Sequence, residues 1–324
     1  MEKIKLGIIG CGIAARDLHW PVLQKLKDRF EVVAVCNHTE PKAKSFSEMA
    51  GGVPYFLDYH QLLAMPEVEA VDIVLPIELN YQTILDSMKA GKHIIAEKPL
   101  AAGLSEGKKL VVRAEKYGKV AMVAENYRYR RVFNEIAGMI QVGMIGKPYS
   151  VFWDFFQKID IKNNKYAQTG WRNHQRYPGG FVTDSGIHNI AALRMIFGKI
   201  IPAAAFIRSA NPELGRIDSL SLQFKTGEKV RGVFNAFFSS EGYNANRLVI
   251  IGKDGTIFFE DGSLTVKNET GTVYSQTFVD DTGYREEFED FYQSVRNGSE
   301  TKSPIKEAYQ DLKVIIDALE LAKN

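Results

Sequence analysis

Short apolar segments alternate with helical patterns over the first 120 residues, and this alternation restricts the possible fold more than any other feature of the chain. It is typical of βαβ units, in which consecutive strands run parallel and the connecting helices cover the sheet. The pattern predicts a doubly wound parallel sheet of the Rossmann type. The expected strands are Lys5–Ile9, Glu31–Cys36, Ala70–Leu75, His93–Ala96 and Val120–Ala124, and the expected helices are Ala15–Asp28, Tyr81–Ala90 and Ser105–Tyr117.

The pattern changes after Asn126. Strand-like segments follow one another, and most are joined by glycine-containing turns such as Asp254-Gly255, which is typical of antiparallel sheets. We therefore expect an α/β protein with a Rossmann domain at residues 1–124 and an α+β domain with a large, mostly antiparallel open sheet at residues 125–324. The expected strands of this domain are Tyr149–Gln157, Ala203–Ser209, Ser219–Lys225, Lys229–Phe238, Asn246–Ile251, Thr256–Glu260, Ser263–Lys267 and Thr272–Thr277, and its helices include Val132–Val142, Tyr284–Arg296 and Ile305–Ala322.

Composition excludes several classes of protein. Hydrophobic residues make up 45% and charged residues 25% of the 324 residues, which is typical of folded water-soluble proteins and not of disordered chains. The net charge is only +2 and no long basic stretch occurs, which argues against a nucleic-acid partner. The apolar run Ile200–Ile207 is too short for a membrane span, and no signal-peptide pattern precedes the first strand, so we expect a cytoplasmic protein. Cys11 and Cys36 lack metal-ligand spacing, so we expect reduced thiols and no metal site.

A glycine motif lies where the first strand meets the first helix. Gly10-x-Gly12-x-x-Ala15 fits the fingerprint of a dinucleotide-binding turn. Gly10 permits a tight turn, Gly12 lets the backbone approach a pyrophosphate, and Ala15 keeps the helix close to the sheet. Amides near Ile13 and Ala14 would then face the phosphates at a helix amino terminus. The alternative interpretation is an ordinary tight turn.

The residues that follow the second strand predict which nicotinamide cofactor the protein accepts. An acidic side chain normally binds the adenosine ribose at this point, but this chain has Asn37-His38-Thr39. Asn37 does not repel a 2′-phosphate, and Lys42 and Lys44 follow closely. We therefore expect NAD(P) as cofactor, with NADP moderately preferred. Alternatively, these residues only begin the next helix.

Two further motifs carry groups suited to proton transfer. Glu97-Lys98-Pro99 follows a predicted strand directly, so Lys98 would stand at the carboxyl edge of the sheet, where it could donate to a substrate oxygen. Asp184 and His188 are four residues apart in a predicted helix, so they would share one face, and an imidazole there could take a proton from an alcohol. Taken alone, the first motif is usually a solvated turn and the second a helix cap beside a surface histidine.

These motifs together closely resemble the glucose-fructose oxidoreductase/inositol dehydrogenase/MocA (Gfo/Idh/MocA) family, and the resemblance extends over nearly the whole chain. Further landmarks of the family are Ala90-Gly91-Lys92-His93, Gly143-x-x-Gly146-Lys147-Pro148, Gly179-Gly180, Trp171-Arg172 and Ala308-x-x-Asp311-Leu312.

The resemblance implies an oxidoreductase that transfers a hydride between nicotinamide C4 and a secondary alcohol or ketone of a sugar, inositol or related polyol. By analogy, His188 is the general base in oxidation and the acid in reduction, and Lys98 flanks the same hydroxyl. Asp184 would orient or polarise this pair. A cis peptide bond before Pro99 is also implied, and it would turn Lys98 toward the reactants.

The resemblance extends to binding residues. The expected cofactor contacts include Leu75, Pro76, Asn80, Glu97 and Lys98, with Asn80 standing where many relatives have a histidine. The expected substrate contacts, besides the catalytic residues, are Arg128, Trp171, Arg172 and Tyr177. About half of these four should be structural, because arginine and aromatic residues also serve cores and surfaces.

Three further expectations concern function and partners. One alternative function is a nucleotide-sensing regulator that kept the fold and lost catalysis, although it would not need Lys98, Asp184 and His188 together. A second is a reductase of a non-sugar carbonyl or diol. The strands Val151–Gln157 and Val230–Phe238 carry apolar residues on both faces, so we expect a homodimer or homotetramer formed through the open sheet face.

His19 and His93 are expected to be packed or surface histidines.

Overall fold

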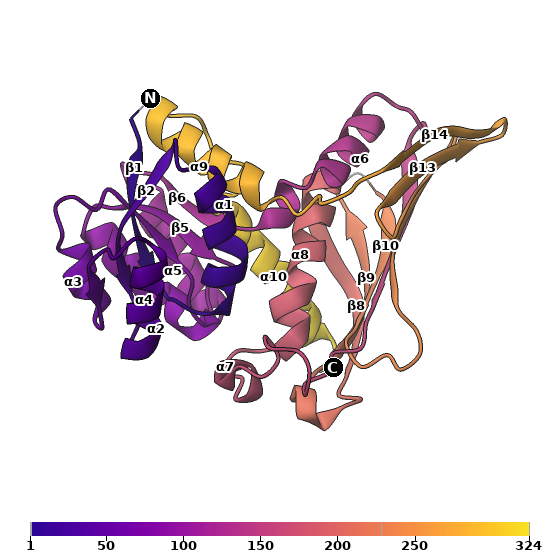
Figure 1. Cartoon of the computed structure of the whole chain (residues 1–324). Coiled ribbons are helices and arrows are strands. Elements are labelled where there is room, and N and C mark those ends of the chain that lie inside the picture. The colour runs from indigo at the N-terminus through magenta and orange to yellow at the C-terminus, as the bar shows by residue number, and fades with distance from the viewer. Residues whose placement is uncertain (1, 228, 324) are drawn as a thin grey trace. The chain divides into compact units, whose positions relative to one another are not determined.

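Residues 2–227 and 229–323 are described by a computed structural model, in which the chain forms two compact units (Figure 1). The first unit contains Met1–Glu125 and Tyr284–Tyr309, and the second contains Asn126–Gly283 and Gln310–Asn324. This division differs from the expected one because residues 284–309 return to the first unit. The physical reason is aromatic packing: Phe288, Phe291 and Tyr292 are fully buried, and all three rings contact Phe30.

The first unit has the expected Rossmann architecture. Its six strands are parallel, in the order β3-β2-β1-β4-β5-β6. The strands are β1 (Ile4–Ile9), β2 (Phe30–Cys36), β3 (Tyr55–Phe56), β4 (Ala70–Ile73), β5 (His93–Glu97) and β6 (Ala121–Ala124). The helices are η1 (Ala15–His19), α1 (Trp20–Lys25), α2 (Glu40–Met49), α3 (Tyr59–Leu63), α4 (Ile77–Lys89), α5 (Leu104–Ala114) and α9 (Tyr284–Asn297).

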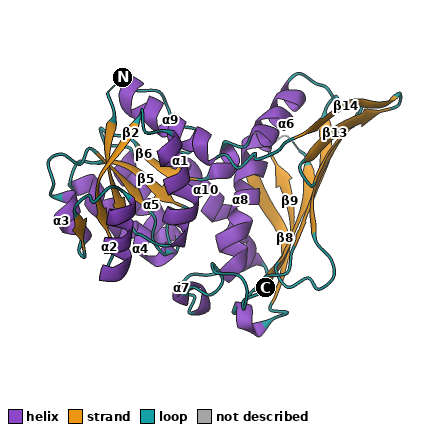
Figure 2. Cartoon of the chain, in the orientation of Figure 1, coloured by secondary structure: helices purple, strands orange, loops and turns teal. Residues whose placement is uncertain are grey.

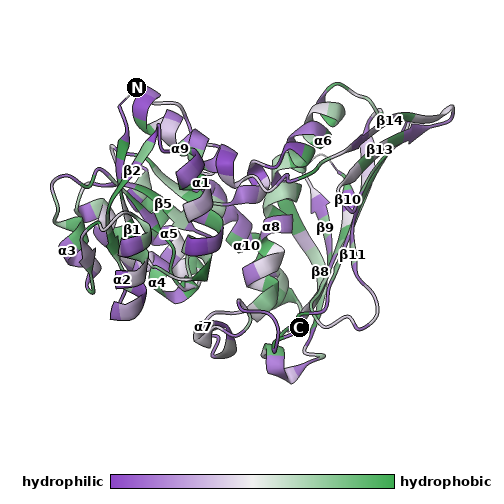
Figure 3. Ribbon diagram, viewed as in Figure 1, coloured by the Kyte–Doolittle hydropathy of each residue, from purple (hydrophilic) through white to green (hydrophobic). Residues whose placement is uncertain are grey.

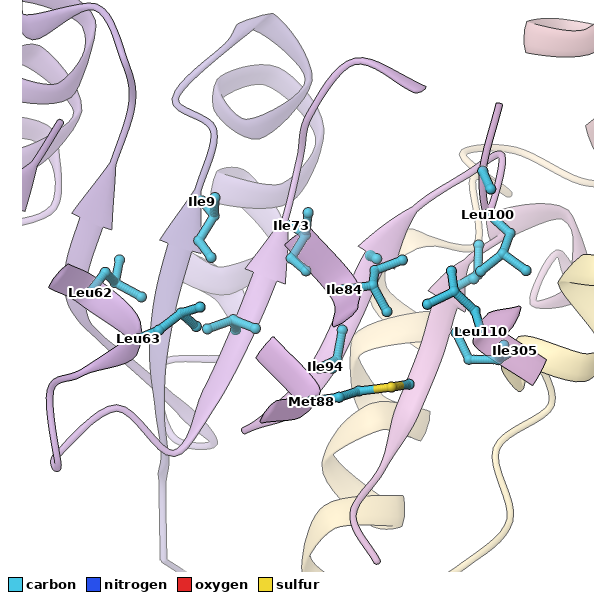
Figure 4. Packing of buried hydrophobic residues seen from close by; sticks show 14 of the residues in the cluster. Ile9, Leu62, Leu63, Ile73, Ile84, Met88, Ile94, Leu100, Leu110 and Ile305 are labelled. Carbon is cyan, nitrogen blue, oxygen red and sulfur yellow. The ribbon is translucent and has the colours of Figure 1, made fainter. Parts of the chain in front are cut away.

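Inward-facing apolar residues from strands and helices hold this unit together. Ile73 and Ile94 of neighbouring strands pack with Ile84 and Met88 of α4, and Leu110 of α5 continues the same cluster (Figure 4). These side chains are almost completely buried. Parallel strands covered on both faces are expected to be mostly apolar, and β4 is buried throughout, with Asp72 as its polar residue.

Two local features differ from the expected elements. The predicted helix Ala15–Asp28 is split into η1, which is a π-helix, and α1. The short elements β3 and α3 were not expected, because two and five residues carry too little periodicity to stand out in a sequence. The ten-residue helix α2 was expected only as the alternative interpretation of the residues after Asn37.

The second unit contains the expected large sheet. Its eight strands have the order β14-β13-β12-β11-β7-β10-β9-β8, and β7 pairs with β10 in parallel while the other pairs are antiparallel. The strands are β7 (Pro148–Phe156), β8 (Ile200–Arg208), β9 (Ser219–Thr226), β10 (Arg231–Phe237), β11 (Ala245–Gly252), β12 (Thr256–Glu260), β13 (Ser263–Asn268) and β14 (Gly271–Thr277). The helices are η2 (Asn126–Arg128), α6 (Arg131–Gln141), α7 (Gly170–Asn173), α8 (Gly180–Phe197), η3 (Pro212–Leu214) and α10 (Ile305–Leu321), the last of which begins in the first unit.

The two faces of this sheet differ. Helices α6 and α8 lie on one face (Figure 2), and Figure 3 shows hydrophobic residues along α8. Trp153 and Phe234 point to this face and are fully buried. The register places Phe152 and Phe206 on the opposite face, where they are 42% and 75% exposed. The second unit therefore has one covered and one open sheet face. None of the helices in the described part of the chain is long and apolar enough to cross a membrane.

Candidate active site

The expected cofactor residues follow the carboxyl ends of four strands in the first unit. Gly10 to Ala14 follow β1, Asn37 to Thr39 follow β2, Leu75 to Asn80 follow β4, and Glu97 and Lys98 stand at the end of β5. Because these strands are parallel, their carboxyl ends meet at one edge of the sheet, which is where open α/β folds bind ligands.

The glycine turn has the geometry that a dinucleotide needs. Gly10 has φ +105°, and a Cβ atom there would lie 2.1 Å from the Val74 carbonyl oxygen, so only glycine fits. Gly12 differs, because a Cβ atom on it would meet nothing within 4 Å. Its carbonyl accepts a hydrogen bond from the Arg16 amide at 3.2 Å, so the open space lies at the start of the first helical segment. This open position at a helix start is where the sequence predicts a pyrophosphate.

Asn37 braces the turn at the end of β2. Its side chain is buried, its Oδ1 accepts from the Cys11 amide at 3.2 Å, and its Nδ2 donates to the Thr39 carbonyl at 3.2 Å. His38 is exposed and Thr39 precedes α2, in which Lys42 is also exposed. Of the residues expected near the adenosine 2′ position, His38 and Lys42 are thus accessible, whereas Asn37 is buried. Burial raises the pKa of Cys11 and of Cys36 to about 12, so both thiols stay protonated.

Asn80 holds the loop that carries Lys98. Its Nδ2 donates to the Glu97 carbonyl at 2.9 Å and to the Pro99 carbonyl at 2.8 Å, so one amide group joins both sides of Lys98. The expected cis peptide bond between Lys98 and Pro99 is present. Leu75 and Pro76 are half-buried before α4, and Pro76 is the residue that precedes its first turn.

In the second unit, a pair of glycines starts the helix that carries Asp184 and His188. Gly179 and Gly180 have φ of +83° and +50°, and a Cβ atom on Gly179 would lie 2.2 Å from the Thr183 hydroxyl. The hydroxyl itself donates to the Pro178 carbonyl at 2.6 Å. Glycine at positions 179 and 180 therefore permits the left-handed backbone of this turn into α8.

Asp184 is held by Arg172. The Arg172 Nε atom donates to Asp184 Oδ2 at 2.6 Å, and the carboxylate is almost fully buried. The same guanidinium lies over the Trp171 ring at 4.0 Å, and the Trp171 ring contacts that of Tyr177. The structure thus brings Trp171 and Arg172 of α7, Tyr177 of the following segment and Asp184 of α8 together.

His188 is half-buried and stacked on Tyr127, with ring centroids 4.8 Å apart. The Arg130 guanidinium lies on Tyr127 at 4.8 Å. Tyr127 was missed by sequence reasoning, which selected its neighbour Arg128 from the same segment. No sequence signal could distinguish the two, because the stacking depends on the contact between η2 and α8.

Arg128 is part of a buried ion-pair group. It donates to both carboxylate oxygens of Asp311 in α10, at 2.6 and 2.8 Å, and Arg194 donates to the same carboxylate at 2.5 Å. All three side chains are at most 9% exposed. These ion pairs join η2, α8 and α10. Asp311, which is one of the family landmarks, therefore has a structural role as the shared partner of two arginines.

Family models match both units. The model for the "Oxidoreductase family, NAD-binding Rossmann fold" matches residues 4–125, and the model for the "GFO/IDH/MocA C-terminal domain" matches residues 133–258.

Individual proteins match over most of their length. An uncharacterized protein of Saccharomyces cerevisiae is 31% identical over 266 residues, which cover 79% of this chain and 74% of that protein. A myo-inositol 2-dehydrogenase of Thermotoga maritima is 24% identical over 311 residues, covering 91% and 89%. The crystal structure of an oxidoreductase from Thermotoga maritima has a TM-score of 0.93 at 36% identity and covers 99% of this chain and 97% of that chain. The chain therefore belongs to the Gfo/Idh/MocA family of NAD(P)-dependent oxidoreductases.

Proposed function

We propose that this protein transfers a hydride between nicotinamide C4 of NAD(P) and a secondary alcohol or ketone of a sugar, an inositol or a related polyol. The observation that carries the proposal is the position of Lys98. It follows β5 at the same sheet edge as the Gly10–Gly12 turn, and Asn80 holds the carbonyls on both sides of it. A relative named myo-inositol 2-dehydrogenase supports a polyol as the substrate class.

Each catalytic residue has one task in this proposal. Bound NAD(P) accepts or supplies the hydride. His188 removes the hydroxyl proton during oxidation and returns it during reduction, and Tyr127 fixes the plane of its ring. Lys98 donates a hydrogen bond to the reacting oxygen. Asp184 orients the substrate side of the site through its bond to Arg172.

Aromatic and guanidinium groups form the proposed substrate contacts. Trp171 and Tyr177 offer ring faces. Arg172 would bind substrate through its Nη2 atom, because its Nε donates to Asp184 and its Nη1 donates to Tyr166 and Thr169. Arg128 is proposed to be structural, because its guanidinium is buried and donates to both carboxylate oxygens of Asp311. NADP as the moderately preferred cofactor, a cytoplasmic location and a homo-oligomer formed through the open sheet face belong to the same proposal.

A substrate panel tests this function. Sugars and polyols are incubated with NAD or NADP, and their ketones with the reduced cofactors, while the absorbance of the reduced nicotinamide is followed. We expect turnover with at least one polyol. His188→Ala and Lys98→Ala should each lower kcat by about 10²–10⁴-fold with little effect on cofactor binding.

Matched controls are available in exposed residues of the same types. His60→Ala and Lys89→Ala remove a surface histidine and a surface lysine, and both should keep kcat. Cofactor binding without turnover of any alcohol or ketone would support the regulator instead. Near-normal turnover in His188→Ala and Lys98→Ala would place the chemistry on other residues.

A further inference from the structure

A histidine lies between two carboxylates in the interior of the first unit. His19 is completely buried, and its Nδ1 atom is 2.9 and 3.1 Å from the two carboxylate oxygens of Asp72 in β4. Its Nε2 atom is 3.0 Å from Glu97 Oε1 at the end of β5. Ionised carboxylates only accept hydrogen bonds, so an imidazole that serves both must donate from both nitrogens and carry a positive charge.

The charge of His19 is consistent with its surroundings. Burial alone lowers the pKa of His19, but the Asp72 and Glu97 carboxylates together raise this pKa well above its ordinary value. A third carboxyl, Glu287 of α9, lies in the same region and is fully buried. Burial raises the pKa of Glu287 well above its ordinary value, which favours the neutral form of this carboxyl beside the imidazole.

The backbone brings His19 to this position by an uncommon route. His19 is the last residue of η1, a π-helix that begins directly after the glycine turn. Single π-helical turns are rare and frequently occur at functional sites, because they redirect one side chain. Here the side chain is directed toward Asp72 of β4 and Glu97 of β5, and the Phe288 ring packs edge-on against it with ring centroids 5.3 Å apart.

Glu97 connects His19 to Lys98 through hydrogen bonds of its two carboxylate oxygens. Its second oxygen, Oε2, accepts a hydrogen bond from the Lys98 amide at 3.1 Å. Asn80 fixes the carbonyls on either side, so the N–H of Lys98 and both flanking carbonyls are held by side chains. One oxygen of Glu97 therefore binds His19 while the other positions the peptide of Lys98.

We propose that His19 is a positioning residue: through Glu97 it holds Lys98 in place and couples it to the helix that begins at the dinucleotide turn. This rests on the proposed function in so far as it assigns the catalytic task to Lys98. His19 and Asp72 are both completely buried, so this role assigns neither of them a contact with the reactants. Their contribution is a rigid placement of the lysine, since small displacements of a catalytic group cost about 10²-fold in rate.

The decisive variant is His19→Gln, with His93→Gln as its matched control. His93 lies at the other end of β5. It is partly buried and accepts a hydrogen bond from the Val120 amide. We expect His19→Gln to lower kcat by about 10–100-fold while KM and the cofactor Kd change by less than about threefold. His93→Gln should leave kcat unchanged.

A second measurement does not depend on activity. The rate at which acetic anhydride acylates Lys98 is followed by peptide mass spectrometry, with the exposed Lys89 as internal reference. The Lys98 rate should change at least about threefold in His19→Gln and in Glu97→Gln, while the Lys89 rate stays constant. An altered Lys98 rate in a protein that turns over no alcohol would contradict the proposed function and still support the positioning role.

Two results would overturn the inference. The first is a folded His19→Gln variant with wild-type kcat and wild-type acylation of Lys98. The second is a parallel loss of kcat, cofactor binding and melting temperature, which would show a general structural role. If His19→Gln does not fold, Glu97→Gln decides alone, and an unchanged Lys98 rate in that variant rejects the proposal.

Discussion

Replacing Gly12 by valine should separate cofactor binding from folding. The space beside the Gly12 Cα is empty within 4 Å, and its φ lies outside the left-handed region, so the fold has room for a side chain. That same space is where a pyrophosphate would approach the amides that follow. Losing about two hydrogen bonds to a charged phosphate, at about 1.5–3 kcal/mol each, would cost about 3–6 kcal/mol of binding free energy. This corresponds to a rise in Kd of roughly 10²–10⁴-fold.

Two further variants make the Gly12 experiment specific. Gly103 also precedes a helix of the first unit, with φ −161° and nothing within 4 Å of its Cβ position, so Gly103→Val should keep both stability and binding. Gly10→Ala should instead destabilise the fold, because its Cβ atom would collide with the Val74 carbonyl. Calorimetric titration with NADH and NADPH measures Kd, and circular dichroism measures melting. A folded Gly12→Val protein with wild-type affinity would refute the assignment of the turn.

Three other predictions follow from single residues. Asn37→Asp should shift the ratio of kcat/KM values toward NAD, because a carboxylate repels the 2′-phosphate; a wild-type preference for NAD above about tenfold would contradict the interpretation of this loop. Phe206→Glu places a charge on the open sheet face, so light scattering should show a smaller mass than for the wild type, and a monomeric wild type would rule out the oligomer. Burial raises the pKa of Glu287 in the folded state well above its ordinary value of 4.5, so the free energy of unfolding falls as pH rises above 4.5. Glu287→Met should therefore gain about 1–3 kcal/mol near neutral pH and little near pH 4.5 by denaturant unfolding, and an equal gain at both pH values would contradict the assigned protonation.

Much of the fold could be predicted from the sequence because its causes are local. The period of apolar residues distinguishes strands from helices, and it correctly indicated a parallel sheet followed by a mostly antiparallel one. Gly10 and Gly179 have positive φ angles and close neighbouring atoms, so each position accepts only glycine. A glycine motif in the sequence therefore indicates the turn. The cis peptide bond before Pro99 was likewise implied by a motif.

Tertiary structure alone decided which polar groups meet. The sequence indicated Asp184 and His188 by their spacing, but it did not show that Arg172 binds Asp184 or that Tyr127 stacks on His188. Arg128 pairs with Asp311, 183 residues away.

The same holds for the groups around Lys98. His19 meets a carboxylate 53 residues away, and Asn80 bridges two carbonyls of a different loop. Buried polar groups must find partners when they lose water, and the choice depends on which elements the fold places in contact. The sequence therefore determined the architecture and the chemical groups, while the packing of the elements determined how those groups are paired and held.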